Sequence, residues 1–179
     1  MNAKKIAVVT GAGGRHGIGR AIAIRLAQEG ADVVVTDIEQ SLEAIRPADR
    51  QEGWQGLTSV VKEIEGLGRQ ALGLFSDVSD GAQVQDMVGQ TLDRFGHIDV
   101  LVNNAGSRPG RDRVPVVELE EDAFDEVMRV NVRGTYLCSR AVLPAMIRQG
   151  RGSIINLGSR MGNDHSQGGG VLYSATKAR

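Results

Sequence analysis

The sequence predicts an α/β fold in which a doubly wound parallel sheet carries helices on both faces. Two observations indicate it: short apolar runs alternate with longer amphipathic segments, and the most apolar runs lack the polar alternation of half-exposed strands. Alternation of this kind implies right-handed strand–helix–strand units around a parallel sheet. The expected strands are Ile6–Val9, Val33–Val35, Leu72–Phe75, Val100–Val102 and Ile154–Ile155. The expected helices lie near Ile18–Glu29, Leu57–Leu67, Ala82–Phe95 and Leu119–Arg148.

Length and composition predict that residues 1–179 form a single domain. A chain of 179 residues is long enough for one well-formed core and too short to expect two. Hydrophobic residues (41%) and charged residues (24%) stand in the balance typical of a globular domain. The polar segment Glu39–Gly56, which contains Pro47 and Gly53, predicts an extended loop inserted after the second strand.

Charge and residue usage disfavour several classes of function. The net charge of −1 supplies no basic excess for binding nucleic acid or an anionic membrane. A core strand is expected almost directly after Met1, and no apolar run approaches the length of a membrane span, so we expect a cytoplasmic protein without a leader peptide. The lone Cys138 cannot form an internal disulfide, and the scattered histidines indicate no metal site.

A glycine-rich turn follows the first strand and opens the first helix. It runs from Gly11 to Gly19, with Gly17 and Ile18 at the expected start of the helix. Glycine permits a tight turn, lets backbone N–H groups approach a pyrophosphate, and lets the helix pack close to the strand. The partial positive charge of the helix N-terminus adds to phosphate binding. The turn therefore predicts the dinucleotide-binding site of a Rossmann fold.

The residue that ends the second strand bears on the choice of cofactor. Asp37 lies eighteen residues past Gly19. A carboxylate there can accept hydrogen bonds from both hydroxyls of an adenosine ribose and would repel a 2′-phosphate, which favours NAD over NADP. Arg15 in the glycine turn keeps NADP open, because a guanidinium could bind that phosphate instead. The alternative interpretation of Asp37 is a solvated residue at a strand end.

Further motifs follow in chain order, and together they resemble the classical short-chain dehydrogenase/reductase family. Asp77-Val78 follows the third strand, Asn103-Asn104-Ala105-Gly106 follows the fourth, and Tyr173-Ser174-Ala175-Thr176-Lys177 matches the family's Tyr-x-x-x-Lys. The resemblance runs from residue 4 to the last residue and includes Asn131 and Ser159. It implies that the Asp77-Val78 pair contacts the adenine, and that Asn104, Ala105 and Gly106 line the cofactor groove.

The candidate catalytic residues are Asn131, Ser159, Tyr173 and Lys177. Free tyrosine, with a pKa of about 10, is a weak base at neutral pH, and a nearby ammonium stabilises its phenolate. Tyr173 and Lys177 are four residues apart, so on a helix they share one face. Ser159, expected at a strand end, would hydrogen-bond the substrate oxygen. The resemblance implies that Lys177 also binds the nicotinamide ribose.

Asn131 is a lone amide on the mostly apolar stripe of the expected long helix. If buried, it must find hydrogen-bond partners. Considered alone, it would be a satisfied structural amide. The resemblance implies instead that it holds a water molecule that relays protons towards Lys177.

Two departures from the family pattern leave alternatives open. Five residues separate Gly11 and Gly17, more than in the family's common form, so the loop over the pyrophosphate is expected to differ in shape. The chain also ends at Arg179, two residues after Lys177, whereas full-length relatives continue. The expected fold is therefore C-terminally truncated relative to the family.

The predicted function is hydride transfer between NAD(H) and a small alcohol or carbonyl substrate, with Tyr173 as acid and base. One alternative is a truncated dinucleotide-binding fragment that cannot catalyse, and another is an incomplete sequence of a longer protein. Arg108, Arg111 and Arg113 could bind an anionic substrate, although we favour a solvated loop for Ser107–Val116. The sequence does not identify the substrate, and a homo-oligomer is expected for a full-length chain.

Overall fold

The computed structural model describes residues 4–38, 45–108, 110–162 and 170–178. Within these residues the strands form one parallel sheet of five, in the order β3-β2-β1-β4-β5. The strands are β1 (Ile6–Thr10), β2 (Asp32–Asp37), β3 (Ala71–Phe75), β4 (Val100–Asn103) and β5 (Ser153–Asn156). The prediction of a doubly wound parallel sheet is confirmed, and every expected strand is present.

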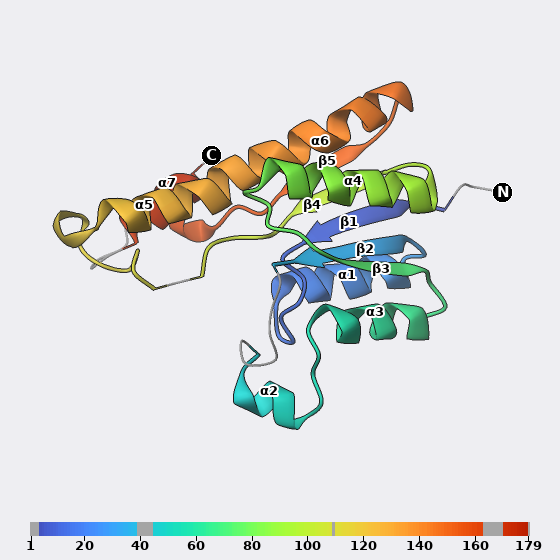
Figure 1. The fold of residues 1–179 in the computed structure, drawn as a ribbon, viewed down its shortest axis with the longest axis horizontal. Helices are drawn as coiled ribbons and strands as arrows, with labels where there is room; N and C mark the ends of the chain where they lie inside the picture. Colours follow the sequence, from blue (N-terminus) through green and yellow to red (C-terminus); the bar gives the residue numbers. More distant parts are fainter. Residues whose placement is uncertain (1–3, 39–44, 109, 163–169, 179) are drawn as a thin grey trace.

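Helices cover both faces of this sheet. Helices α1 (Ile18–Gln28) and α3 (Leu57–Gly66) pack on one face, and α4 (Gly81–Phe95) and α6 (Thr135–Arg148) pack on the other (Figure 1). The remaining helical segments are α2 (Pro47–Gln51), α5 (Glu121–Met128) and α7 (Val171–Lys177), with 3-10 turns at Val116–Glu118 and Arg160–Gly162. No helix in the described ranges is both long and apolar enough to cross a membrane.

The continuous apolar runs of β1 and β2 reflect burial on both faces. Every residue of β1 is buried. Successive strand side chains point to opposite faces, so Val8 and Val34 enter the core beneath α4 and α6, whereas Val9 and Val35 enter the core beneath α1 and α3. A strand covered in this way has no exposed face on which polar residues could alternate.

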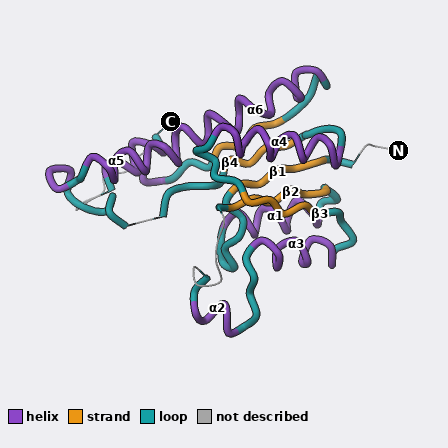
Figure 2. The backbone as a smooth tube through the Cα atoms, in the orientation of Figure 1, coloured by secondary structure: helices purple, strands orange, loops and turns teal. Residues whose placement is uncertain are grey.

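The strand order creates a crevice at the carboxyl end of the sheet. From β1 the chain winds outward to β2 and β3, and it then returns to place β4 on the other side of β1. The order therefore reverses between β1 and β4, which is the position where open α/β sheets bind their ligands. Figure 2 shows connecting segments, including the turn after β1, gathered at the end of the sheet towards which the strands run.

The long helix predicted over Leu119–Arg148 is present but contains a π-helical turn. Helix α5 passes directly into a π-helical turn, Arg129–Gly134, which passes into α6. A π-helical turn adds a residue to one helical turn and often occurs at functional sites. Asn131 lies in it, and a Cβ at Gly134 would come within 2.7 Å of the Val78 side chain. The turn therefore sits directly against the segment that follows β3.

The prediction of an extended loop over Glu39–Gly56 is wrong in its second half. Residues 39–44 lie outside the described part of the chain, but Pro47–Gln51 forms α2. Pro47 occupies the first helical turn, where the missing N–H of proline costs nothing. The buried Asp49 in that turn accepts a hydrogen bond from Arg46 and forms an ion pair with Arg15. The helix is too short to be stable alone, so these tertiary contacts hold it.

Candidate active site

The glycine turn makes backbone contacts that a side chain would prevent. Gly11 has a φ of +67°, and a Cβ there would lie 2.8 Å from the Ala105 Cα. A Cβ on Gly19 would lie 2.5 Å from the Gly11 carbonyl oxygen. Gly19 is buried, whereas Gly17 and Ile18 are more accessible at the mouth of the turn. The turn, the start of α1 and the segment after β4 therefore meet at the crevice.

Asn104 joins the two strands that flank the crevice. Its side-chain N–H groups donate to the carbonyl oxygens of Thr10 (2.8 Å) and Gly11 (2.9 Å). In return, the Thr10 hydroxyl accepts hydrogen bonds from the backbone N–H groups of Asn104 and Ala105, both at 3.1 Å. Gly106 follows and is exposed. The Asn104 side-chain amide nitrogen therefore hydrogen-bonds the backbone that forms the predicted cofactor groove.

Asp37 points into the glycine turn. Its carboxylate accepts hydrogen bonds from the backbone N–H groups of Gly13 (2.7 Å) and Ile38 (2.9 Å). Burial raises the pKa of Asp37 above its usual value, and the two backbone hydrogen bonds oppose that shift. The interpretation of Asp37 as a freely solvated strand-end residue therefore does not describe its surroundings, because the carboxylate is an integral part of the turn.

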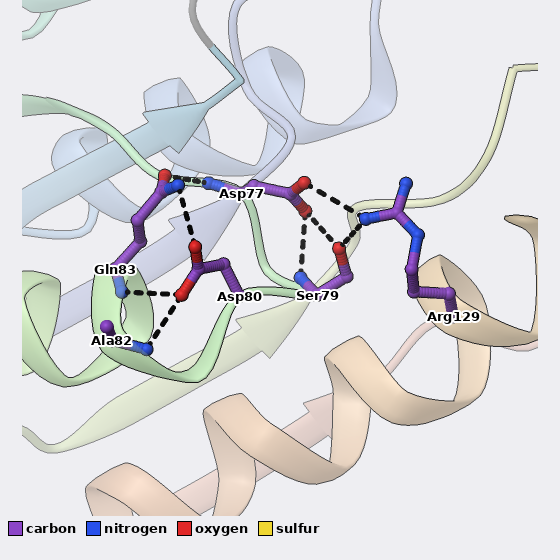
Figure 3. A network of polar contacts seen from close by, with 6 residues as sticks. All are labelled: Asp77, Ser79, Asp80, Ala82, Gln83 and Arg129. Carbon is purple, nitrogen blue, oxygen red and sulfur yellow. Dashed lines mark hydrogen bonds and ion pairs between the residues drawn. The ribbon is translucent and has the colours of Figure 1, made fainter.

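Asp77 takes part in a polar network between the β3–α4 connection and the long helix (Figure 3). Its carboxylate accepts hydrogen bonds from the Ser79 hydroxyl (2.6 Å) and from Arg129 (3.2 Å), while Asp80 caps the N-terminus of α4. Partial burial opposes ionisation, but the bonds from Ser79 and Arg129 hold the pKa of Asp77 below its usual value. Val78 is buried against the π-helical turn. The network orients the segment that was predicted to contact adenine.

The segment after β2 folds back on the glycine turn. Arg15 pairs with Asp49 (3.6 Å) and with Glu52, so its guanidinium is engaged by two carboxylates. The indole N–H of the buried Trp54 donates to the Gly13 carbonyl oxygen (3.0 Å), and the Arg20 guanidinium lies over the indole ring at 5.2 Å. Together the two segments line an open cavity of about 460 Å³. The longer glycine turn is therefore held by the inserted segment.

We expect Trp54→Phe to lower the free energy of unfolding by about 1 kcal/mol, because the ring remains while the hydrogen bond to Gly13 is lost. Trp54→Ala also removes the buried ring and should cost about 3–5 kcal/mol. Urea unfolding of both variants measures these values. Equal stability of Trp54→Phe and the wild type would show that the hydrogen bond does not hold the turn.

Asn131 connects the segment after β4 to α7. Its amide oxygen accepts a hydrogen bond from the Ser107 backbone N–H (2.8 Å), and its amide nitrogen donates to the Thr176 hydroxyl (3.1 Å). The residue is 4% exposed, so both polar atoms of a buried amide have partners within the protein. The structure thus gives Asn131 a clear positional role: it fixes the helix that carries Tyr173 and Lys177.

Tyr173 and Lys177 are neighbours on α7, as predicted from their spacing. The Lys177 ammonium lies 5.9 Å from the centre of the Tyr173 ring and donates a hydrogen bond to the Leu157 carbonyl oxygen (2.9 Å). Burial lowers the pKa of Lys177. Leu157 follows β5, and a Cβ on Gly162 would overlap the Lys177 carbonyl, so α7 packs tightly on the segment after β5.

Ser159 lies between β5 and the 3-10 turn Arg160–Gly162. Its hydroxyl oxygen accepts a hydrogen bond from the Met161 backbone N–H at 3.2 Å. Within the described residues it makes no hydrogen bond to Tyr173 or Lys177. The fold therefore brings the segments of the four candidate residues to one end of the sheet, while the side chains are linked through Ser107, Thr176 and Leu157 rather than directly.

Trp54 and Thr176 were not predicted to be parts of the site, and Arg113 was named only in the less favoured alternative, as one of three arginines that could bind an anionic substrate. Arg113 was assigned to a solvated loop, but its guanidinium lies over the Tyr173 ring, with 4.8 Å between the guanidinium carbon and the ring centre. No local pattern marks these residues, because each acquires its contact from a segment distant in sequence. Arg111, in contrast, pairs with Glu120 and Asp122 on the surface, as a solvated loop would predict.

The sheet order and the glycine turn at its switch point define a Rossmann-fold protein. A sequence model described as short chain dehydrogenase matches residues 5–179, so the chain belongs to the short-chain dehydrogenase/reductase family. It is 36% identical over 174 residues to the 3-oxoacyl-(acyl-carrier-protein) reductase FabG of Thermotoga maritima, a match that covers 97% of this chain and 63% of the relative. It is 34% identical over 178 residues to the short-chain dehydrogenase/reductase eriH of Hericium erinaceus, covering 99% and 65%.

Solved structures of dehydrogenases and reductases have the same fold over nearly all of this chain. An NAD⁺-bound xylitol dehydrogenase superposes with a TM-score of 0.82 at 31% identity, over 99% of this chain and 61% of that one. Levodione reductase superposes with a TM-score of 0.81 at 32% identity, over 97% and 60%. This chain thus spans less than two thirds of the length of these relatives.

Proposed function

We propose that residues 1–179 form a single dinucleotide-binding and catalytic domain of an NAD(H)-dependent oxidoreductase that acts on a small alcohol or carbonyl compound. One observation carries the proposal: Tyr173 and Lys177 share a face of α7, and Asn131 and Leu157 tie that helix to the segments that follow β4 and β5. The pair therefore stands at the end of the sheet where the glycine turn lies.

The glycine turn fits a dinucleotide. A Cβ at Gly11 or Gly19 would collide with backbone, so only glycine leaves the turn open beside the N-terminus of α1. The Asp37 carboxylate lies in the turn, where it can accept hydrogen bonds from the ribose hydroxyls and repel a 2′-phosphate. Both carboxylates near Arg15 reduce its attraction for such a phosphate. When bound, the nicotinamide would supply or accept the hydride.

The proton chemistry belongs to the residues of this chain. In the direction of carbonyl reduction, the Tyr173 hydroxyl would donate a proton to the substrate oxygen, and in the direction of oxidation its phenolate would accept that proton. The Lys177 ammonium would stabilise the phenolate electrostatically. The Ser159 hydroxyl would donate a hydrogen bond to the substrate oxygen as negative charge develops. Asn131 would hold α7 in place and could also orient a water molecule near Lys177.

The test is a titration of the chain with NADH and NADPH by calorimetry, followed by a panel of alcohols and ketones monitored through NADH absorbance. We expect saturable binding with preference for NADH, and turnover of at least one substrate. Binding without any turnover would favour the alternative of a dinucleotide-binding fragment. Absence of binding would refute both.

Asp37→Asn tests the origin of the cofactor preference. The amide oxygen of asparagine can still accept the Gly13 N–H, so the turn keeps its hydrogen bond while the negative charge is lost. We expect the preference for NADH over NADPH to fall by about tenfold, which corresponds to about 1.4 kcal/mol. An unchanged ratio of the two dissociation constants would show that Asp37 does not discriminate between them.

A further inference from the structure

We propose that Arg113 determines substrate specificity by binding a carboxylate of the substrate whose oxygen Tyr173 protonates. The proposal rests on the proposed function and deepens it, because it names the substrate class: short oxo acids and the corresponding hydroxy acids. Neutral ketones and alcohols of the same size would be poor substrates.

The Arg113 side chain lies against the ring of Tyr173. The Arg113 guanidinium carbon lies 4.8 Å from the centre of the Tyr173 ring, and one of its terminal nitrogens lies 3.5 Å from the Met161 sulfur. Met161 belongs to the turn that follows Ser159 and donates its backbone N–H to the Ser159 hydroxyl. The guanidinium thus lies against Tyr173 and against the residue whose backbone N–H binds the Ser159 hydroxyl. An anion bound to it would place the rest of a small molecule beside them.

Arg113 has guanidinium N–H donors that lack a hydrogen-bond partner within the described residues. Its buried Nε forms an ion pair with Asp112 at 3.6 Å but makes no hydrogen bond in those residues. The one hydrogen-bond acceptor recorded for the guanidinium in those residues is the Met161 sulfur, a weak acceptor. The side chain is 34% exposed although its Nε is buried, so a ligand would reach the terminal guanidinium nitrogens rather than Nε. A carboxylate matches the planar donors of a guanidinium better than any other common substrate group.

The other two arginines of the same loop, Arg108 and Arg111, have different surroundings from Arg113. Arg111 is exposed and hydrogen-bonds Glu120 (2.7 Å) and Asp122 (2.6 Å), so its charge is already paired. Arg108 lines the cavity at the glycine turn. Asp112 is buried beside Arg113 and accepts the Gly110 backbone N–H, so it stabilises the loop and orients the guanidinium. Of these three arginines, Arg113 is the one whose guanidinium lies on Tyr173.

In reduction, NADH would give a hydride to the carbonyl carbon and become NAD⁺, and Tyr173 would give a proton to the carbonyl oxygen, so that the oxo acid becomes a hydroxy acid. Solvent would then return a proton to the Tyr173 phenolate, so the net reaction consumes one NADH and one proton. The carboxylate is unchanged and serves to bind and orient the molecule. Charge-assisted hydrogen bonds of this kind change affinity by about 10- to 100-fold.

The experiment compares acids with their neutral amides, using acetoacetate against acetoacetamide and levulinate against levulinamide. Binding to the NADH-saturated chain is measured by calorimetry, and kcat and KM are measured from NADH oxidation. The proteins are the wild type, Arg113→Gln, Arg113→Lys and the matched control Arg111→Gln. Arg111→Gln removes the same charge from the same loop at a position that is already paired.

We expect the wild type to bind at least one acid about tenfold or more tightly than its amide. Arg113→Gln should abolish that preference by raising KM for the acid alone, Arg113→Lys should retain part of it, and Arg111→Gln should retain it in full. Equal binding of both acids and their amides by the wild type, or no binding of either acid, would overturn the proposal, whether or not Arg113→Gln folds. So would a preserved preference in Arg113→Gln. If the wild type binds an acid more tightly than its amide but never oxidises NADH, the proposed oxidoreductase activity is refuted, whereas the proposed anion-binding role of Arg113 is supported.

Discussion

Replacing Tyr173 with phenylalanine should reduce turnover by at least about a hundredfold while leaving NADH affinity nearly unchanged. The substitution removes one hydroxyl group, which makes no hydrogen bond within the described residues, and it keeps the ring that packs against Arg113 and Lys177. Helix α7 should therefore stay in place, held by the contact between Asn131 and Thr176. Only the proton transfer to the substrate oxygen should be lost. Steady-state kinetics and an NADH titration measure the two effects separately.

The other tyrosine of the chain provides a matched control. Tyr136 is exposed on α6 and, like Tyr173, is followed four residues later by a cationic residue. This residue, Arg140, donates a hydrogen bond to the Tyr136 hydroxyl at 3.3 Å. Tyr136→Phe should leave turnover, NADH affinity and stability close to the wild type. The proposed acid/base role would be refuted if Tyr173→Phe retained full turnover. A parallel loss of turnover and NADH affinity in Tyr173→Phe would indicate a structural defect instead.

Gly19→Ala should weaken NADH binding strongly and lower the free energy of unfolding by about 1–3 kcal/mol. A Cβ at this position would stand 2.5 Å from the Gly11 carbonyl oxygen and 3.0 Å from the Ala12 Cα. Both are backbone atoms, so the added methyl group cannot be accommodated by a change of side-chain rotamer. Helix α1 would have to move away from the turn, and the backbone N–H groups at its start would lose their alignment. Denaturant unfolding and NADH calorimetry measure the two consequences.

The control for this substitution is another glycine-to-alanine change inside a helix. Gly89 lies within α4, and a Cβ there would meet nothing within 4 Å. Gly89→Ala should therefore stabilise the chain by about 0.5–1 kcal/mol, since alanine favours the helix and restricts the unfolded chain. If Gly19→Ala behaved like Gly89→Ala, the close approach of α1 to the turn would not be a requirement of the fold.

The sheet was predictable because its cause is local. Strands buried on both faces are mostly apolar, and the buried runs Ile6–Val9 in β1 and Val33–Val35 in β2 meet that condition. The positions of Gly11, Gly19 and Asp37 follow from the strand–turn–helix order. The spacing of Tyr173 and Lys177 likewise predicts a shared helix face, and α7 has it. In each case, residues close in sequence carry the whole pattern.

The π-helical turn and helix α2 could not be predicted, because they depend on contacts between segments distant in sequence. Asn131 was recognisable as an unusual amide, but the π-helical turn that holds it and its bonds to Ser107 and Thr176 have no local signature. Helix α2 was missed because a segment this short is stabilised by its contacts, the ion pair of Asp49 with Arg15 and the hydrogen bond from the Trp54 backbone N–H to the Asp49 carbonyl oxygen, and not by its own periodicity.

The order of the strands and of the longer helices and the position of the glycine turn could be predicted from the amino-acid sequence, because periodicity and turn composition are properties of neighbouring residues. The candidate catalytic residues followed from the resemblance to the short-chain dehydrogenase/reductase family. Which cations face which groups depended on the tertiary structure. Arg15 forms ion pairs with Asp49 and Glu52, whereas the Arg113 guanidinium lies over the ring of Tyr173. An arginine looks the same in a sequence whether it is paired, solvated or aimed at a site. Only the packing of loops at the end of the sheet distinguishes these cases.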